Sequence, residues 1–93
     1  MTNQANTTKA ADAAQSATID CELTDTFGGE ANYSWVRRET LTVPAGISDR
    51  ALVRRGKAAL GLSGVRCRVS NMGDMIELRP VGSCTVAFLT TRY

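Results

Sequence analysis

The sequence predicts an α+β domain in which an antiparallel sheet of about five strands carries one helix on one face, in the order β-β-α-β-β-β. Two observations predict this architecture. Four segments alternate apolar with polar residues, the two-residue period of a strand with one buried face, and a fifth segment is apolar on both sides. One segment between the second and third of these has helical spacing and recognisable helix ends. The glycine-rich connections between strands are short, which favours antiparallel neighbours.

The first predicted strand is "ATIDCELTDTF", residues 17–27, where Ile19, Cys21 and Leu23 share one side. The glycine pair at 28–29 can adopt the positive φ angles of a turn. The segment therefore forms the first arm of a hairpin.

The second arm is "YSWVRRETLTV", residues 33–43. Tyr33 and Trp35 start its apolar side and are expected in the core, whereas Arg37 and Glu39 interrupt that side. An interruption of this kind indicates a strand whose middle leaves the core or carries a bulge. The alternative role of the two aromatic rings is to offer stacking surfaces near Arg37.

The predicted helix lies within "SDRALVRRGKAALGL", residues 48–62. Ser48 is a good N-cap, so the helix should begin at the next residue. Gly61 is placed to terminate it in the left-handed conformation. Leu52 and Gly56 fall on the apolar side, where the missing side chain of the glycine lets the helix approach the sheet.

The remaining strands are expected in residues 65–70, 75–80 and 84–91. The last of them is apolar on both sides, which is typical of a central strand. All three cysteines (Cys21, Cys67 and Cys84) fall at inward positions of the strand pattern, where a thiol usually serves as a small apolar group. Asp20 and Glu22 lie on the outer side of the first strand, and we expect them to pair with arginines of neighbouring strands. If the first and third strands are neighbours, those arginines would be Arg66 and Arg68.

Residues 1–16 are expected to form a flexible N-terminal tail, because no large apolar residue follows Met1 there. Residues 17–93 then form a single domain. Residues 1–30 contain one basic and five acidic residues, a net charge of −4. Residues 31–93 contain ten basic and four acidic residues, a net charge of +6, so the basic charge belongs to the second two-thirds of the chain.

The chain has no histidine, which excludes His-based catalytic triads and His-ligated metals. The three cysteines lack the spacing of a zinc site. We therefore expect no catalytic centre, no metal and no cofactor. The sequence also has no apolar run of the roughly 20 residues that a membrane span needs and no signal-peptide pattern, so we expect a cytoplasmic protein without a membrane partner.

Arginine-rich positions in the predicted helix and strands are the candidate partner-binding residues. Arginine recognises phosphate and carboxylate groups through paired hydrogen bonds. The alternative is a solubilising surface without a partner. The candidates are Arg37, Arg38, Arg50, Arg54, Arg55, Lys57, Arg66, Arg68 and Arg79.

The stretches "NYSWVRRETLTVPAG", "SDRALVRRGKAALGLSGVRCR", "GDMIELRP" and "CTVAFL" together resemble a group of small proteins carried on proteobacterial plasmids, prophages and other mobile elements. The resemblance covers roughly residues 18–90 and supplies no catalytic or ligand residue. It implies that the protein is an accessory factor. Such factors include inhibitors of host defence, namely anti-CRISPR and anti-restriction proteins, and small DNA-binding regulators.

We therefore expect a non-enzymatic binding protein that inhibits a host defence complex. Its partner would be a larger host protein or ribonucleoprotein, contacted by the arginine-bearing helix and sheet face. The net charge is positive, so the chain does not simply mimic DNA charge. The alternative is a nucleic-acid-binding accessory or regulatory protein.

Overall fold

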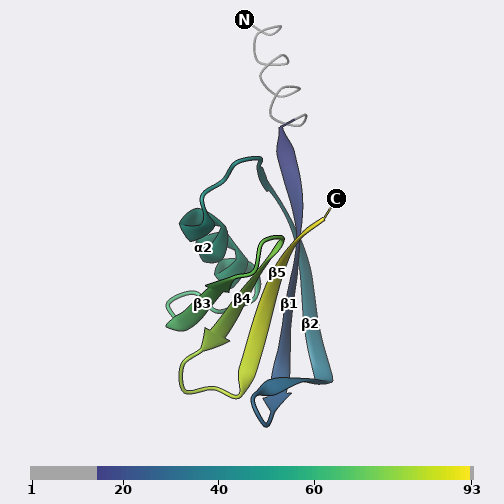
Figure 1. Ribbon diagram of the computed structural model, residues 1–93, viewed down its shortest axis with the longest axis vertical. Coiled ribbons are helices and arrows are strands. Elements are labelled where there is room, and N and C mark those ends of the chain that lie inside the picture. Colours follow the sequence, from purple (N-terminus) through teal and green to yellow (C-terminus); the bar gives the residue numbers. More distant parts are fainter. Residues whose placement is uncertain (1–14, 93) are drawn as a thin grey trace, which may run out of the picture.

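The structure, a computed structural model, describes residues 15–92. Within these residues, one helix and five strands follow one another in the predicted order (Figure 1). The prediction of a flexible tail over residues 1–16 falls largely outside the described residues. The elements are β1 (Ser16–Phe27), β2 (Glu30–Pro44), α2 (Asp49–Ala59), β3 (Cys67–Asn71), β4 (Met75–Pro80) and β5 (Thr85–Arg92).

The five strands form one antiparallel sheet in the order β2-β1-β5-β4-β3. The α+β class, the first hairpin and the central position of the last strand are confirmed. β1 and β3 are not neighbours, however, because β5 returns between β1 and β4. The condition under which Arg66 and Arg68 would pair with the acids of β1 is therefore not met.

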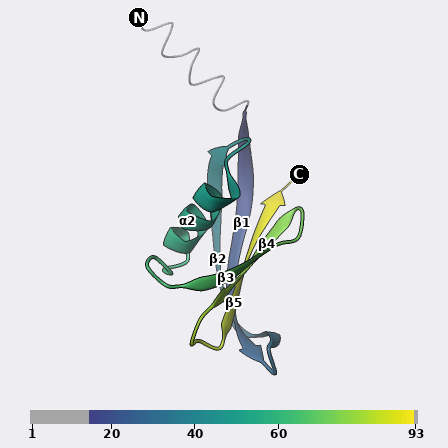
Figure 2. The ribbon, with the colours of Figure 1, turned by 60° about the vertical axis from the view of Figure 1, so that its left-hand side comes forward.

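One face of the sheet is covered by α2, as Figures 1 and 2 show. Its central strands direct alternate apolar side chains toward the helix, which is the arrangement that the two-residue period predicts. The buried residues of this core are Ile19, Cys21, Leu23, Val43, Leu52, Leu60, Ile76, Leu78, Ala87 and Leu89.

The helix is fixed at both ends and at its middle. The Ser48 hydroxyl accepts a hydrogen bond from the Ala51 amide at 3.2 Å, which confirms the predicted N-cap. Gly61 follows the last turn with φ +74°, the expected left-handed conformation. At the middle, a Cβ on Gly56 would lie only 2.6 Å from a methyl carbon of Leu89 on β5, which confirms that this glycine permits the close approach of helix and sheet.

The prediction that Tyr33 and Trp35 lie in the core is wrong. Tyr33 is 50% exposed and Trp35 is 46% exposed. The pairing of β1 with β2 shifts between Thr24 and Thr26, because a bulge inserts extra residues in β2, and Tyr33 takes a left-handed φ of 58°. A bulge re-aims side chains, so the odd-numbered alternation fails before Val36.

The cysteine predictions hold only in part. Cys21 is buried, Cys67 is half-buried, and Cys84 is exposed because it precedes β5 in a turn. Val69, which shares the alternation of Cys67 two residues earlier, is 51% exposed. It lies on β3, an edge strand of the sheet.

Gly56→Ala should destabilise the protein, although alanine is the better helix former by roughly 1 kcal/mol. The new methyl would collide with Leu89, which is 1% exposed and closely surrounded, and overpacking costs about 1–3 kcal/mol. Urea unfolding measures the difference. At the exposed position Ala58, alanine should be the more stable residue, so Ala58→Gly should lower the free energy of unfolding. A Gly56→Ala variant more stable than the parent would contradict the close contact.

Candidate functional site

The basic side chains of α2 project from a helix whose other side is buried. Leu52 and Gly56 are buried against the sheet, whereas Arg50, Arg54 and Arg55 are exposed and Lys57 is half-buried. The spacing i, i+4, i+7 places Arg50, Arg54 and Lys57 on one stripe of the helix. We call these four basic residues the helix patch.

No member of the helix patch forms an ion pair or a side-chain hydrogen bond within residues 15–92. The acid of the same helix, Asp49, instead accepts a hydrogen bond from the neutral Asn71 side chain on β3. The patch therefore presents concentrated positive charge that the described part of the protein leaves uncompensated, and such a surface attracts an anionic partner.

A shallow hollow of about 350 Å³ lies beside this stripe. It is lined by Arg50, Arg54 and Lys57 with Val53 between them, and by the Ser63–Gly64 turn after the helix. Its lining contains three cations and no carboxylate. An anionic group could therefore enter it without meeting like charge.

The predicted arginines of the sheet do not join the helix patch. Arg37 lies at the C-terminal end of α2, where its Nη2 donates to the Ala59 carbonyl oxygen at 3.2 Å and its Nε lies 3.7 Å from Glu39. A cation at this end of a helix stabilises the unpaired carbonyls and the helix dipole. Arg37 therefore has a structural role, which accounts for its place on the otherwise apolar side of β2.

On the sheet face away from α2, which we call the open face, arginines pair with two of the carboxylates of β1, Glu22 and Asp20. Arg38 on β2 donates to Glu22 at 3.2 Å, and Arg92 on β5 forms two hydrogen bonds to Asp20, of 2.5 and 3.1 Å. The prediction that these acids pair across strands is confirmed, with different partners. The remaining candidates, Arg66, Arg68 and Arg79, belong to the segment entering β3 and to β3 and β4.

A bulge was one of the two explanations predicted for the interrupted apolar side of β2, but it lies before Val36 and not at Arg37 and Glu39. Asp25 accepts hydrogen bonds from the Ser34 hydroxyl at 2.6 Å, the Ser34 amide at 2.9 Å and the Asn32 side chain at 2.9 Å. Thr24, fully buried, accepts from the Tyr33 amide at 3.1 Å. These bonds satisfy backbone groups that the bulge removes from the strand ladder.

The bulge leaves three aromatic rings exposed at the hairpin end: Phe27, at 80%, with Tyr33 and Trp35. Figure 2 shows this end turned away from the side of the sheet that carries α2. Partial desolvation, with a hydrogen bond to the Glu22 carboxylate, raises the pKa of Tyr33. Exposed aromatic rings are enriched at binding surfaces. The exposure of Tyr33 and Trp35 is therefore consistent with the alternative prediction that they offer stacking surfaces.

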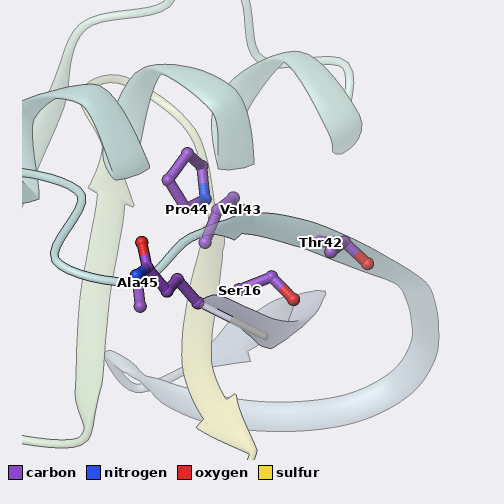
Figure 3. A pocket seen from close by; sticks show the side chains of 6 residues that line it. Ser16, Thr42, Val43, Pro44 and Ala45 are labelled. Carbon is purple, nitrogen blue, oxygen red and sulfur yellow. The ribbon is translucent and has the colours of Figure 1, made fainter. Parts of the chain in front are cut away.

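A further hollow of about 330 Å³ lies where β1 begins and β2 ends (Figure 3). It is lined by Gln15, Ser16 and residues 42–45, none of which is charged. At this hollow the Ala45 amide donates a hydrogen bond to the Gln15 carbonyl oxygen at 2.5 Å, which joins the backbone after β2 to the backbone before β1. With no ionisable group in its lining, this hollow offers no acid, base or ion-binding chemistry.

Within residues 15–92, no three His, Cys, Asp or Glu side chains come together in a way that could hold a metal ion. The same part of the chain contains no helix that is long and apolar enough to cross a membrane. Comparison with known proteins finds no match for this chain among protein-family models, curated proteins or solved structures.

The stability of the bulge should depend on the charge of Asp25. Hydrogen bonds from Ser34, and then from Asn32, hold the pKa of Asp25 well below its ordinary value of 3.8. Below about pH 4 the unfolded chain takes up a proton that the folded chain does not, so this stabilisation falls as the pH drops. Urea unfolding, followed by Trp35 fluorescence, measures the free energy of unfolding. Between pH 5 and pH 3 this free energy should fall more for the parent than for Asp25→Asn. Equal losses would contradict this role.

The three thiols should react in the order of their exposure. Burial, followed by the charges of Asp20 and Glu39, raises the pKa of Cys21 to about 11, so only roughly one part in a thousand is thiolate at pH 8. Iodoacetamide should modify Cys84 fastest and reach Cys21 only on unfolding, which peptide mass spectrometry can follow. Cys84→Ser should remove the fast phase. Native labelling of Cys21 at the rate of Cys84 would contradict the packing.

Proposed function

We propose that this protein is a small non-enzymatic binding protein that docks on an acidic surface of a larger protein or ribonucleoprotein complex through α2. The observation that supports this most is the helix patch. Arg50, Arg54, Arg55 and Lys57 have no ion-pair partner within the described chain, although four other arginines there are paired with acids. Arginine is also enriched among the residues that dominate binding energy at interfaces.

The resemblance to mobile-element accessory proteins suggests which acidic partner this is. Such proteins act in the bacterial cytoplasm against host complexes, so we propose that the partner is a host defence complex and that docking inhibits it, as anti-CRISPR proteins do. A stable interface buries about 800 Å² on each partner. The 11 residues of α2 would supply its centre, and the Ser63–Gly64 turn would extend it.

A nucleic acid is the second candidate partner, favoured by the acid-free lining of the hollow beside α2. Phosphates would take the place of the partner's carboxylates, with Trp35 available for base stacking. The salt dependence of binding to generic DNA or RNA separates a nucleic-acid partner from a protein partner. The logarithm of affinity for generic DNA or RNA should fall linearly with the logarithm of salt concentration. Absence of binding to either at low salt removes this candidate.

Reversing charge in the helix patch should abolish inhibition without unfolding the protein. In bacteria with an active CRISPR or restriction system, the parent chain should raise the transformation efficiency of a targeted plasmid. Arg54→Glu with Arg55→Glu should remove this effect and weaken capture of the defence complex at least about 100-fold, because interface arginines contribute about 2 kcal/mol or more each. Circular dichroism and melting should stay near the parent, because exposed charges contribute little to stability.

The matched control is Arg66→Glu with Arg68→Glu. It makes the same change in net charge at two exposed arginines that form no ion pair in residues 15–92. This control should retain inhibition. Full inhibition by the folded helix variant, with loss of inhibition in the control, would place the binding surface on the sheet instead.

A further inference from the structure

Two arginines face each other across neighbouring strands on the open face. Arg68 on β3 and Arg79 on β4 are direct partners in the antiparallel register. Their neighbours Val69 and Leu78 are likewise paired, and Leu78 belongs to the core under α2, so the arginines point to the other side of the sheet. Like charges directly opposite each other destabilise a strand pair.

The protein compensates only one of these charges. Arg79 donates from Nε to Glu77 at 2.8 Å and from Nη1 to the Gly29 carbonyl oxygen at 2.6 Å, which ties β4 to the β1–β2 turn. Arg68 has neither an ion pair nor a side-chain hydrogen bond to any described residue. The pair therefore keeps an excess positive charge at a fixed point of the sheet.

This charge borders a hollow of about 370 Å³ between the β1–β2 turn and the β4–β5 turn. Both turns lie at the same end of the sheet in Figures 1 and 2. Arg68 and Arg79 line the hollow together with Ser83 and Thr85, whose hydroxyl oxygens are 3.0 Å apart. Its lining contains no carboxylate, and the hydroxyls are able to donate to an anion.

We propose that this hollow binds a phosphate group. The group would bridge the two guanidinium ions, which relieves their repulsion, while Ser83 and Thr85 donate to its remaining oxygens. A tetrahedral oxyanion suits donors that converge from three strands and a turn, and guanidinium groups match phosphate oxygens in pairs. The site is separate from the helix patch, because the sheet lies between them.

The test is thermal unfolding of the full chain in rising inorganic phosphate, with chloride adjusted to hold ionic strength constant. Phosphate should raise the melting temperature of the parent in a saturable way, because a ligand that binds only the folded state stabilises it. Arg68→Gln should weaken the phosphate affinity at least about tenfold. In chloride alone, the same variant should melt at or above the parent temperature, since the repulsion is gone.

Arg68→Gln should thus weaken the response to phosphate without lowering the melting temperature in chloride. This combination distinguishes a ligand site from a structural role, because loss of a structural contact would lower the melting temperature in both phosphate and chloride. Arg66→Gln, at an exposed arginine that lines neither this hollow nor the one beside α2, is the matched control and should keep the full phosphate response. The proposal is overturned if phosphate stabilises no more than chloride does, or if Arg66→Gln loses the response and Arg68→Gln keeps it.

The same unfolding measurement with adenosine monophosphate and with adenosine shows whether the ligand is free phosphate or a phosphorylated metabolite. Equal responses to inorganic phosphate and the nucleotide identify the phosphate group alone as the ligand. A nucleotide affinity at least tenfold higher identifies a phosphorylated metabolite that uses the rest of the hollow. Both results support the site, whereas an equal response to adenosine, which lacks phosphate, contradicts it.

Discussion

The contact between Gly56 of α2 and Leu89 of β5 is the constraint on which the rest of the structure depends. It brings the one helix against the central strand of the sheet, and the core forms around this approach. A domain this small has little other apolar surface to bury. Because the glycine side of α2 is fixed to the sheet, the opposite side must present Arg50, Arg54, Arg55 and Lys57 to solvent. The packing of the helix thus determines where the uncompensated charge lies.

A single helix covers only part of a five-stranded sheet, and the uncovered parts are stabilised by polar contacts. On the open face, the pairs Arg38–Glu22 and Arg92–Asp20 span β1 and both of its neighbours. At the hairpin end, Asp25 holds the bulge, and Arg79 connects β4 to the turn at Gly29. Paired charges therefore lie over the middle strands, and the unpaired ones lie on α2 and toward β3. We propose that these two unpaired regions are the sites where the protein meets other molecules.

Local patterns predicted the elements, but they could not predict what depends on long-range pairing. The N-cap at Ser48, the helix end at Gly61 and the role of Gly56 follow from neighbouring residues, and all three are confirmed. Strand order does not follow from local pattern, so the arginines that pair with Asp20 and Glu22 could not be identified from it. Trp35 was placed in the core because the alternation was continued through a bulge, whose only signal is the polar cluster of Asp25, Asn32 and Ser34. The helix patch was visible as a cluster of basic residues, whereas its lack of partners required the structure.

Arginine footprinting tests the central claim most directly, namely that the basic side of α2 is the binding surface. The protein is treated with phenylglyoxal alone and in complex with its proposed partner, and modification at each arginine is quantified by peptide mass spectrometry. We predict that complex formation protects Arg50, Arg54 and Arg55 and leaves Arg66 and Arg68 as reactive as in the free protein. Protection of Arg66 and Arg68, with all three helix arginines still reactive, would contradict the account.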